Sequence, residues 1–425
     1  MIRFFSPFLL ILVSLALQAN QTQDIVAVES KVINWRRDLH AHPELSNREF
    51  RTSKIIAQHL KSLGMEVKTG VAHTGVVGFL KGDFPGPTIA LRADMDALPV
   101  TEQVDLEFAS KEQAQYRGET VGVMHACGHD THVAMLMGAA EIFAKNKDTL
   151  KGSILFLFQP AEEGAPEGEQ GGAEMMLSEG VFKQYKPDVA FGIHVTSSIP
   201  SGILGYHAGP AMAAVDTFDL TVNGKQTHGS RPWGGVDPIV ASAQIINAVQ
   251  TIVSRKVDVT KAAAVVSFGA IKGGIRSNII PDKVEMVGTI RNFDMGIRDI
   301  IHQNLHQVVE NTAKASGATA ELVIHSGYPV TINNPELVEQ MLPSLRKVFG
   351  EKKVIDMGMI TGAEDFSYFA QEVPGFFFFM GVTPPEVNAK TAPTNHSPLF
   401  YVDESNLING VKAFVQLVND YKVPK

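Results

Sequence analysis

The sequence contains a single cysteine, Cys127, in 425 residues. A chain with one thiol cannot form an internal disulfide bond, so this residue is a buried inert thiol, an intermolecular link or a functional group. Runs of basic residues are also absent, and the formal net charge is −8. Because nucleic acids and anionic membrane surfaces attract clustered positive charge, neither is an expected partner.

Long apolar runs are confined to the N-terminus, where Phe4–Leu17 follows one positive charge at Arg3. A short apolar core ahead of a small residue, here Ala19, is typical of a secretory signal peptide. The run is short for a membrane-spanning helix, and an uncleaved anchor is the alternative. We expect residues 1–19 to be removed and the mature protein to be exported, either to the periplasm or out of the cell.

The length of the chain predicts two domains, and its apolar content of 44% is sufficient for a real core. Up to about residue 210, apolar strands alternate with helices, which indicates an α/β domain with an open, mostly parallel sheet. The order then becomes β-α-β-β-α-β, the ferredoxin-like split unit. We therefore predict a catalytic domain in two segments, 20–210 and 329–425, with an α+β domain inserted at 211–328.

Chemistry-bearing residues gather in Met124–His132, which holds three imidazoles, one carboxylate and the only thiol just before an apolar helical run. Ligands of open parallel sheets bind beyond the carboxyl ends of the strands. The other predicted strand ends carry similar groups, so we expect them to converge with this turn. These groups are Asp94, Asp96, Glu162, Glu163, His194 and His396.

Imidazoles, carboxylates and a thiolate are suited to two borderline divalent ions. Cys127 and His129 are two residues apart and can point the same way, while Asp96 or Asp130 can orient a ligating imidazole. Adjacent glutamates do not easily face one ion together, which favours one ligand and one general base. A serine or cysteine nucleophile is the competing mechanism, but the chain has no Gly-x-Ser-x-Gly elbow.

From about residue 30 to 420 the chain resembles the M20 metallopeptidase family, and the matching motifs occur in the same order. The nearest branch is that of the aminoacylase and hippurate hydrolase-type amidohydrolases, which includes the indole-acetyl-amino-acid hydrolases. The motifs that carry the resemblance are Arg92–Pro99, His125–Asp130, Gln159–Gly164, Phe191–Val195, Gly362–Ser367 and Asn395–Pro398. The resemblance implies a zinc-exopeptidase-like catalytic domain and makes the inserted domain a lid through which a homodimer forms.

Roles for individual residues follow from the same resemblance. Glu162 would be the general base and Asp96 the orienting carboxylate, whereas Asp94 replaces a ligating His of wider family members. The implied metal ligands are Cys127, which two ions would share, His129, Glu163, His194 and His396. In the inserted domain His228 would stabilise the oxyanion, and the substrate would contact Asn278, Arg276 and Arg291. His125 and His132 are expected to have structural or outer-shell roles.

These observations predict a metal-dependent amidohydrolase that cleaves N-acyl or aryl-acyl amino acids with metal-activated water. Zinc or manganese is the expected metal, and cobalt or nickel is possible. The partner is then a small N-acyl-amino-acid substrate. A dipeptidase or carboxypeptidase of the same family is the alternative, and a non-catalytic binding module that retains the fold is a remote one.

Overall fold

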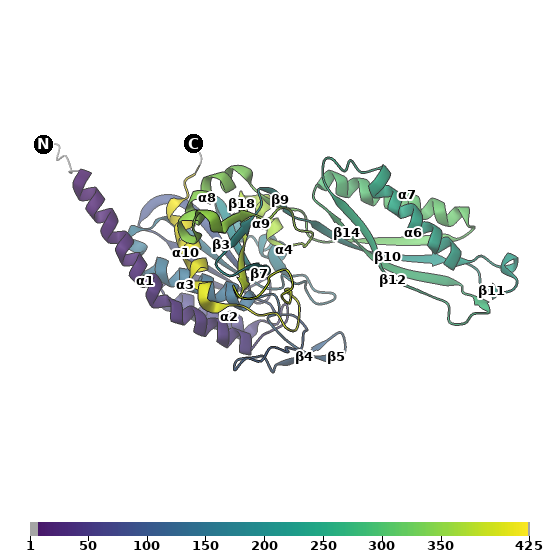
Figure 1. Cartoon of the computed structure of the whole chain (residues 1–425), viewed down its shortest axis with the longest axis horizontal. Coiled ribbons are helices and arrows are strands. Elements are labelled where there is room, and N and C mark those ends of the chain that lie inside the picture. The colour runs from purple at the N-terminus through teal and green to yellow at the C-terminus, as the bar shows by residue number, and fades with distance from the viewer. Residues whose placement is uncertain (1–6, 424–425) are drawn as a thin grey trace. The chain divides into compact units, whose positions relative to one another are not determined.

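The computed structural model describes residues 7–423, and their side chains from residue 23 onward. By its internal contacts the chain divides into two compact units. Unit 1 comprises the residues up to 208, 333–357 and those from 368, and unit 2 comprises 209–332 and 358–367. Figure 1 labels several elements of each unit.

The first helix, α1 (Pro7–Ala41), begins in the predicted signal peptide. Residues 1–6 of that peptide, and the side chains of its remainder, lie outside the described part of the chain. Among the residues that are described, no helix has both the length and the apolar character that crossing a membrane requires.

Unit 1 is built on an eight-stranded sheet in the order β1-β2-β6-β3-β7-β18-β8-β17. The four strands β6, β3, β7 and β18 run parallel. On one side β2 pairs antiparallel with β6, and on the other side β8 pairs antiparallel with β18. The strands are β1 (Glu66–Val71), β2 (Gly75–Lys81), β6 (Lys151–Gln159), β3 (Phe84–Asp94), β7 (Val189–Pro200), β18 (Gly375–Thr383), β8 (Leu204–Tyr206) and β17 (Val354–Asp356).

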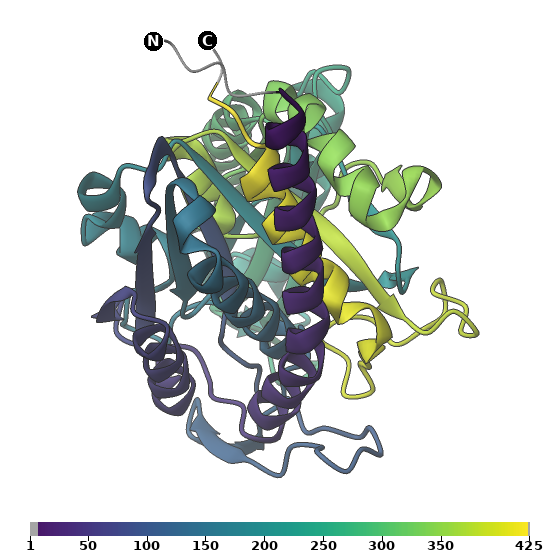
Figure 2. The same ribbon diagram turned by 90° about the vertical axis from the view of Figure 1, so that its left-hand side faces the viewer.

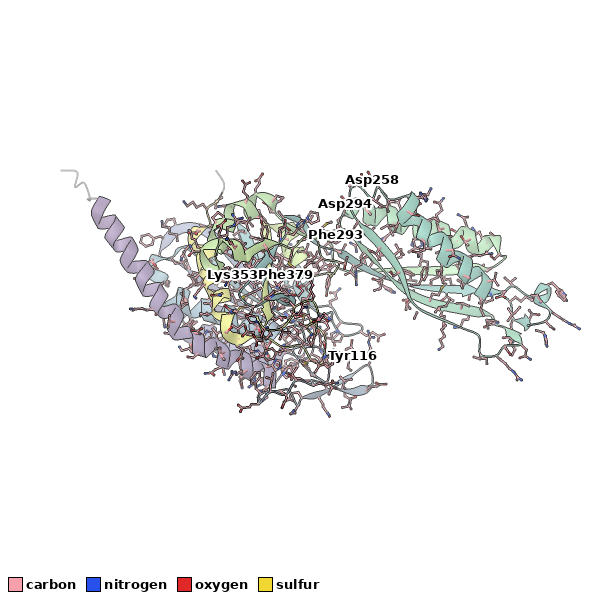
Figure 3. All side chains as sticks on the ribbon, viewed as in Figure 1. Tyr116, Asp258, Phe293, Asp294, Lys353 and Phe379 are labelled. Carbon is pink, nitrogen blue, oxygen red and sulfur yellow. The ribbon has the colours of Figure 1, made fainter. Side chains whose placement is uncertain are left out.

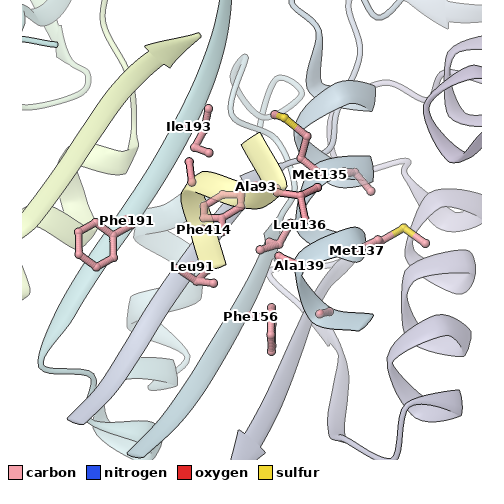
Figure 4. Close-up of a cluster of buried hydrophobic side chains, with 14 of the residues drawn as sticks. Leu91, Ala93, Met135, Leu136, Met137, Ala139, Phe156, Phe191, Ile193 and Phe414 are labelled. Atoms are coloured by element: carbon pink, nitrogen blue, oxygen red, sulfur yellow. The ribbon is translucent and has the colours of Figure 1, made fainter. Parts of the chain in front are cut away.

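The core of unit 1 lies between this sheet and helix α3 (His129–Lys145), which is buried from His129 to Phe143. Helices α1 and α10 (Leu407–Asp420) pack against α3 and against each other (Figure 2). A Cβ atom on Gly138 would lie 2.7 Å from a methyl group of Val32, so this glycine permits the close approach of α1 to α3. Figure 4 shows Leu136 and Ala139 of α3 in one buried cluster with side chains of β3, β6 and β7.

Two further long helices pack on the sheet of unit 1 or on its other helices. Helix α2 (Phe50–Ser62) packs on β1 and β2, and α8 (Pro335–Phe349) packs on α10 and on the β17 and β18 side of the sheet. The short helices α4 (Gly172–Ser178), α5 (Val181–Tyr185) and α9 (Phe366–Glu372) lie in the connections. A small hairpin is formed by β4 (Gln113–Tyr116) and β5 (Glu119–Gly122).

Unit 2 contains a four-stranded antiparallel sheet in the order β12-β14-β10-β15, covered on one face by α6 (Pro238–Arg255) and α7 (Met295–Ala315). Asp294, labelled in Figure 3, caps the N-terminus of α7, and its side chain accepts a hydrogen bond from the Ile297 amide at 2.9 Å. The strands of this sheet are β10 (Ala214–Asn223), β12 (Ala264–Gly273), β14 (Lys283–Asn292) and β15 (Thr319–Ser326). Strands β11 (Thr227–His228) and β13 (Ile279–Ile280) form a separate pair.

The predicted fold class is confirmed: one unit is a mostly parallel α/β sheet, and the other has the β-α-β-β-α-β order of the ferredoxin-like unit. The structure also assigns Gly358–Ser367 to unit 2, whereas the sequence places this segment in the second catalytic segment. The reason is backbone pairing, since the Ala213 amide donates to the carbonyl of Ile360 at 3.1 Å and to that of Gly362 at 3.0 Å. Such pairing leaves no local pattern in the sequence.

Candidate metal centre

The predicted strand-end residues of unit 1 come together in the structure. Strand β3 ends at Asp94, β6 leads into Glu162 and Glu163, and β7 carries His194. Helix α3 begins at His129, and the loop before α10 supplies His396. Because β6, β3 and β7 run parallel, their carboxyl ends meet at one edge of the sheet, where ligands of such sheets bind.

The thiol of Cys127 lies between two groups of ligand atoms. Its Sγ is 3.2 Å from Nε2 of His396 and 3.5 Å from Nε2 of His194. The ligand atoms of Cys127, His129 and His194 all lie within 4.8 Å of one another, and so do those of Cys127, Glu163 and His396. Cys127 belongs to both groups, which is the arrangement that one thiolate shared by two ions requires.

His129 presents one buried ring nitrogen to the cluster. Its Nδ1 lies 2.8 Å from the carbonyl oxygen of Asp96 and 3.2 Å from Oδ1 of the same residue, so Nδ1 carries the proton and donates. Nε2 is then the ring nitrogen that faces the cluster, and it has no hydrogen-bond partner among the described residues. It lies 3.8 Å from Glu162 Oε2 and 3.9 Å from Glu163 Oε1.

The charges around His129 favour a cation at this point. Burial alone would lower the pKa of His129, but Asp94, Asp96 and Glu163 outweigh it and raise the pKa to about 10. A cluster of carboxylates that draws a positive charge to Nε2 is equally suited to a divalent ion. The donor set and the orphaned nitrogen therefore fit a metal centre.

His194 and Cys127 have shifted pKa values that bear on metal binding. Burial, followed by the neighbouring His132, holds the pKa of His194 well below its usual range, so the ring is neutral as a metal ligand must be. Nδ1 of His194 donates to the Val195 carbonyl at 2.7 Å, which leaves Nε2 facing the thiol. Burial and the charge of Glu163 raise the pKa of Cys127, and a bound divalent ion would reverse this effect.

Asp94 and His132 lie close to these residues but have other partners. Asp94 accepts hydrogen bonds from Arg92 at 2.6 Å and from Nδ1 of His132 at 2.5 Å. Nε2 of His132 accepts from the Val195 amide at 2.8 Å. Both ring nitrogens of His132 are thus engaged, so this residue supports the backbone next to His194 and has no lone pair for a metal.

The two predicted orienting carboxylates differ in their contacts. Besides holding His129, Asp96 accepts from the Ser46 hydroxyl at 2.7 Å and from the Glu163 amide at 3.0 Å. Asp130 instead lies 2.9 Å from both Arg36 Nε and His40 Nδ1 of α1. The described contacts of Asp130 therefore anchor the first turn of α3 to α1 and orient none of the predicted metal ligands.

Asn395 belongs to one of the motifs named from the sequence, which predicted no role for it. Its amide nitrogen donates to the carbonyls of Cys127 at 3.2 Å and Val195 at 3.0 Å, and its oxygen accepts from the Ser197 amide at 3.2 Å. It thus joins the cysteine turn, strand β7 and the loop of His396. Its position directly before a predicted ligand was the available signal.

Gly128 fixes the turn between two predicted ligands. Its φ is +88°, and a Cβ atom there would lie 2.4 Å from a methyl group of Val195. Since residues with a Cβ rarely adopt this φ, and the space is filled, glycine is required. The turn therefore places Cys127 and His129 on the same side of the sheet edge.

The predicted substrate residues lie in unit 2, and three of them are neighbours there. His228 pairs with Ile279 across β11 and β13, and the Gly229 amide donates to the Asn278 carbonyl at 2.8 Å. Arg276 precedes this pair, and its side chain, like those of His228 and Asn278, is exposed. Arg291 lies at the opposite end of β14 from this group, so the structure does not bring it together with them within unit 2.

The chain is similar to proteins of a known family over most of its length. Residues 90–420 match the model of peptidase family M20/M25/M40. Thermostable carboxypeptidase 2 of Saccharolobus solfataricus is 44% identical over 396 residues, which cover 93% of this chain and 96% of that protein. The N-acetyl-L-cysteine deacetylase of Bacillus subtilis is 38% identical over 385 residues, or 91% of this chain and 86% of that protein.

Among solved structures, a dinuclear metal-binding peptidase of the M20 family from Bacillus subtilis is similar with a TM-score of 0.75. It is 35% identical, and the match covers 92% of this chain and 98% of that chain. The resemblance seen in the sequence motifs is thereby confirmed. This chain belongs to the M20/M25/M40 peptidase family and is a hydrolase that acts on linear amide bonds.

Proposed function

We propose that this enzyme hydrolyses the amide bond between an acyl or aryl-acyl group and a free amino acid with metal-activated water. The observation that carries the proposal is the Cys127 thiol shared by two groups of ligand atoms beside adjacent glutamates. Two divalent ions would be held by Cys127, as the shared ligand, His129, Glu163, His194 and His396. Such ions polarise a scissile carbonyl and lower the pKa of a water molecule.

The two glutamates divide the remaining work between them. Oε1 of Glu163 lies 3.2 Å from Nε2 of His396, within one of the two ligand groups. Glu162 is buried at the edge of the cluster, with its Oε2 3.8 Å from Nε2 of His129. Glu162 therefore takes the proton of the attacking water and passes it to the leaving nitrogen, as a general base and then a general acid.

His228 is suited to stabilise the oxyanion of the tetrahedral intermediate. Its Nδ1 accepts a hydrogen bond from the Ser230 amide at 3.1 Å, so the proton is carried by Nε2 on an exposed ring. An Nε2–H donor aimed at developing negative charge is the usual form of such stabilisation. The neighbouring amide of Asn278 and guanidinium of Arg276 would bind the α-carboxylate of the substrate, with Arg291 a separate candidate.

A carboxypeptidase is the second candidate function, since relatives of that name are 44% identical to this chain. The two activities use the same centre and differ in the acyl side of the amide bond. Turnover of N-acetyl- and N-benzoyl-amino acids should be compared with that of dipeptides and longer peptides ending in the same residue. Higher kcat/KM for the acylated amino acids supports the proposal, and higher kcat/KM for the peptides supports the carboxypeptidase or dipeptidase.

The role of Glu162 can be tested by Glu162→Gln, which removes the base and leaves the size of the side chain unchanged. We expect kcat to fall by about 10²- to 10⁴-fold while two ions stay bound. Glu163→Gln should instead reduce the metal content, and Glu167→Gln, at an exposed position of the same loop, should change neither. An active Glu162→Gln enzyme would contradict the assignment, and a wild-type protein that binds metal but cleaves no amide would favour a binding module.

The metal is proposed to be zinc or manganese, with cobalt or nickel possible. The thiolate favours zinc because it is a soft ligand, whereas carboxylates also suit manganese. Metal analysis of the protein purified from its own host would decide between them. Iron as the resident metal would contradict the proposal.

We also propose a homodimer formed through unit 2. Strand β12 is at the edge of its sheet, and the described residues offer no partner for its outer side. Val265, Ile271 and Ile275 on or beside it are exposed, and an unpaired apolar edge is a template for a second copy. Light scattering should give a dimer mass that Val265→Lys reduces. A monomeric wild-type protein would contradict it.

Export is proposed from the N-terminal sequence alone. The mature protein isolated from its host should lack residues 1–19 and be found in the periplasm or the medium. N-terminal sequencing of protein from each cell fraction tests this. An intact N-terminus in the cytoplasmic fraction would contradict the proposal.

A further inference from the structure

The connection between α1 and α2 contacts the loop that carries both glutamates of the site. We call residues 160–171, which follow β6, the glutamate loop. Asn47 donates to the Gln170 carbonyl at 2.9 Å, and Arg48 pairs with Glu169 at 2.5 Å. Ser46 donates to Asp96, which also accepts from the Glu163 amide. Three successive side chains thus reach the glutamate loop directly or through Asp96.

Glu49, the next residue, makes the contact nearest to the general base. Its side chain is fully buried, and its Oε1 accepts a hydrogen bond from the Ala161 amide at 3.0 Å. Its Oε2 accepts from the Thr74 hydroxyl at 2.5 Å. Ala161 directly precedes Glu162 and has a φ of +52°, a left-handed conformation that residues with a Cβ rarely adopt. Glu49 therefore forms its hydrogen bond with the residue of the glutamate loop whose backbone conformation is unfavourable, Ala161.

The buried position of the Glu49 side chain is not explained by capping of helix α2. It occupies the N-cap position of α2, yet its side chain makes no capping hydrogen bond. That work is done by Glu44, whose two oxygens accept from the amides of Arg51 at 2.9 Å and Thr52 at 2.8 Å. The Glu49 carboxyl is turned away from α2 and toward Ala161.

The electrostatics of Glu49 agree with a hydrogen-bonding role. Burial, with the charge of Asp96 added to it, raises the pKa of Glu49 to about 8. Burial disfavours the charged form, so this carboxyl group contributes through its hydrogen bonds more than through its charge. Glutamine is then a close substitute, because its amide oxygen can accept from Ala161.

We propose that Glu49 is a positioning residue that holds Ala161 in its left-handed conformation and thereby fixes Glu162 for proton transfer. The inference rests on the proposed role of Glu162 as the base. Among the described hydrogen bonds, the Glu49 side chain contacts Ala161 and Thr74 and none of the predicted ligands, so its effect is on geometry. Loss of its hydrogen bond should free the glutamate loop without removing a ligand.

The test compares Glu49→Ala and Glu49→Gln in the metal-loaded protein. Because a small misplacement of a catalytic group lowers the rate by about 100-fold, Glu49→Ala should lose about this much kcat. KM and the two bound ions should be unchanged, and Glu49→Gln should recover most of kcat. If Glu49→Ala does not fold, Thr74→Val removes one hydrogen bond to Glu49 and should lower kcat about fivefold.

Glu44→Ala is the matched control, because it removes a glutamate that accepts two backbone amides in the same segment. It should lower Tm and leave kcat unchanged. Hydrogen exchange of the peptide containing Ala161 should be faster in Glu49→Ala than in wild type, and slow again in Glu49→Gln. Three results would overturn the inference. One is that Glu49→Ala has unchanged exchange and unchanged kcat, and another is that Glu49→Ala loses metal. The third is that Glu44→Ala loses as much kcat as Glu49→Ala.

The test of Glu49 can fail independently of the assignment of Glu162 as the base. If Glu162→Gln stayed active, Glu162 would not be the base, whatever the exchange at Ala161. If Glu162→Gln were inactive while Glu49→Ala kept wild-type kcat, the base would stand and the positioning role of Glu49 would fail.

Discussion

Asn395→Ala should loosen the metal centre without removing a ligand. The side chain makes three hydrogen bonds to backbone groups, with distances of 3.0 to 3.2 Å. At about 1 kcal/mol each, and more where a carbonyl is left without a partner, their loss should destabilise the protein by about 2–4 kcal/mol. Because the bonds join Cys127, β7 and the loop of His396, metal affinity should also fall by about 10- to 100-fold.

The assay pairs urea unfolding of metal-free protein with a chelator competition that measures metal affinity. Asn388→Ala is a suitable control, because Asn388 is exposed and its side chain accepts only from the Lys390 amide of its own loop among the bonds described. This control should leave both quantities unchanged. If Asn395→Ala had wild-type stability and wild-type metal affinity, the role assigned to Asn395 would be refuted.

Three further predictions concern the site turn, unit 2 and the metal. Gly128→Ala should misfold the turn or lower metal content, since its Cβ would lie 2.4 Å from Val195; retained activity and stability would contradict this. Burial would raise the pKa of Asp216, but hydrogen bonds from His302 and Arg298 outweigh it and lower the pKa to about 2. With an unfolded pKa of about 3.9, the resulting stability is present above pH 4 and lost as the pH falls toward 2. Acid unfolding should therefore be less steep in Asp216→Asn, and an unchanged slope would count against the pairing. Chelation should abolish hydrolysis and added zinc or manganese should restore it, whereas full activity in chelator would exclude a metal mechanism.

Much of unit 1 and its site could be predicted from local sequence patterns. Strands β3, β6 and β7 are apolar runs that end in polar groups, and parallel strands bring such ends to one edge. Helix α3 combines a ligand-rich start with an apolar body, both visible in the sequence. The order of strands and helices in unit 2 could also be predicted from the sequence, because strands such as β10 and β14 alternate buried and exposed residues.

Edge strands and long-range hydrogen bonds were not predictable in this way. Strand β1 has mostly exposed or half-buried side chains, and β8 and β17 have three residues each, so none shows a clear apolar pattern. The contacts of Asp130 with α1 and of Glu49 with Ala161 join residues far apart in the chain. Hydrogen bonds of this kind depend on the tertiary fold and leave no periodicity behind.

We propose above all that Cys127 is a ligand shared by two metal ions. X-ray absorption at the zinc edge of protein loaded with two zinc ions tests it directly, because zinc–sulfur and zinc–nitrogen distances differ, at about 2.3 Å and about 2.0–2.1 Å. A bridging thiolate predicts one sulfur neighbour per zinc, which Cys127→Ser removes from both ions. A spectrum with only nitrogen and oxygen neighbours, or with sulfur at half this occupancy, would contradict the claim.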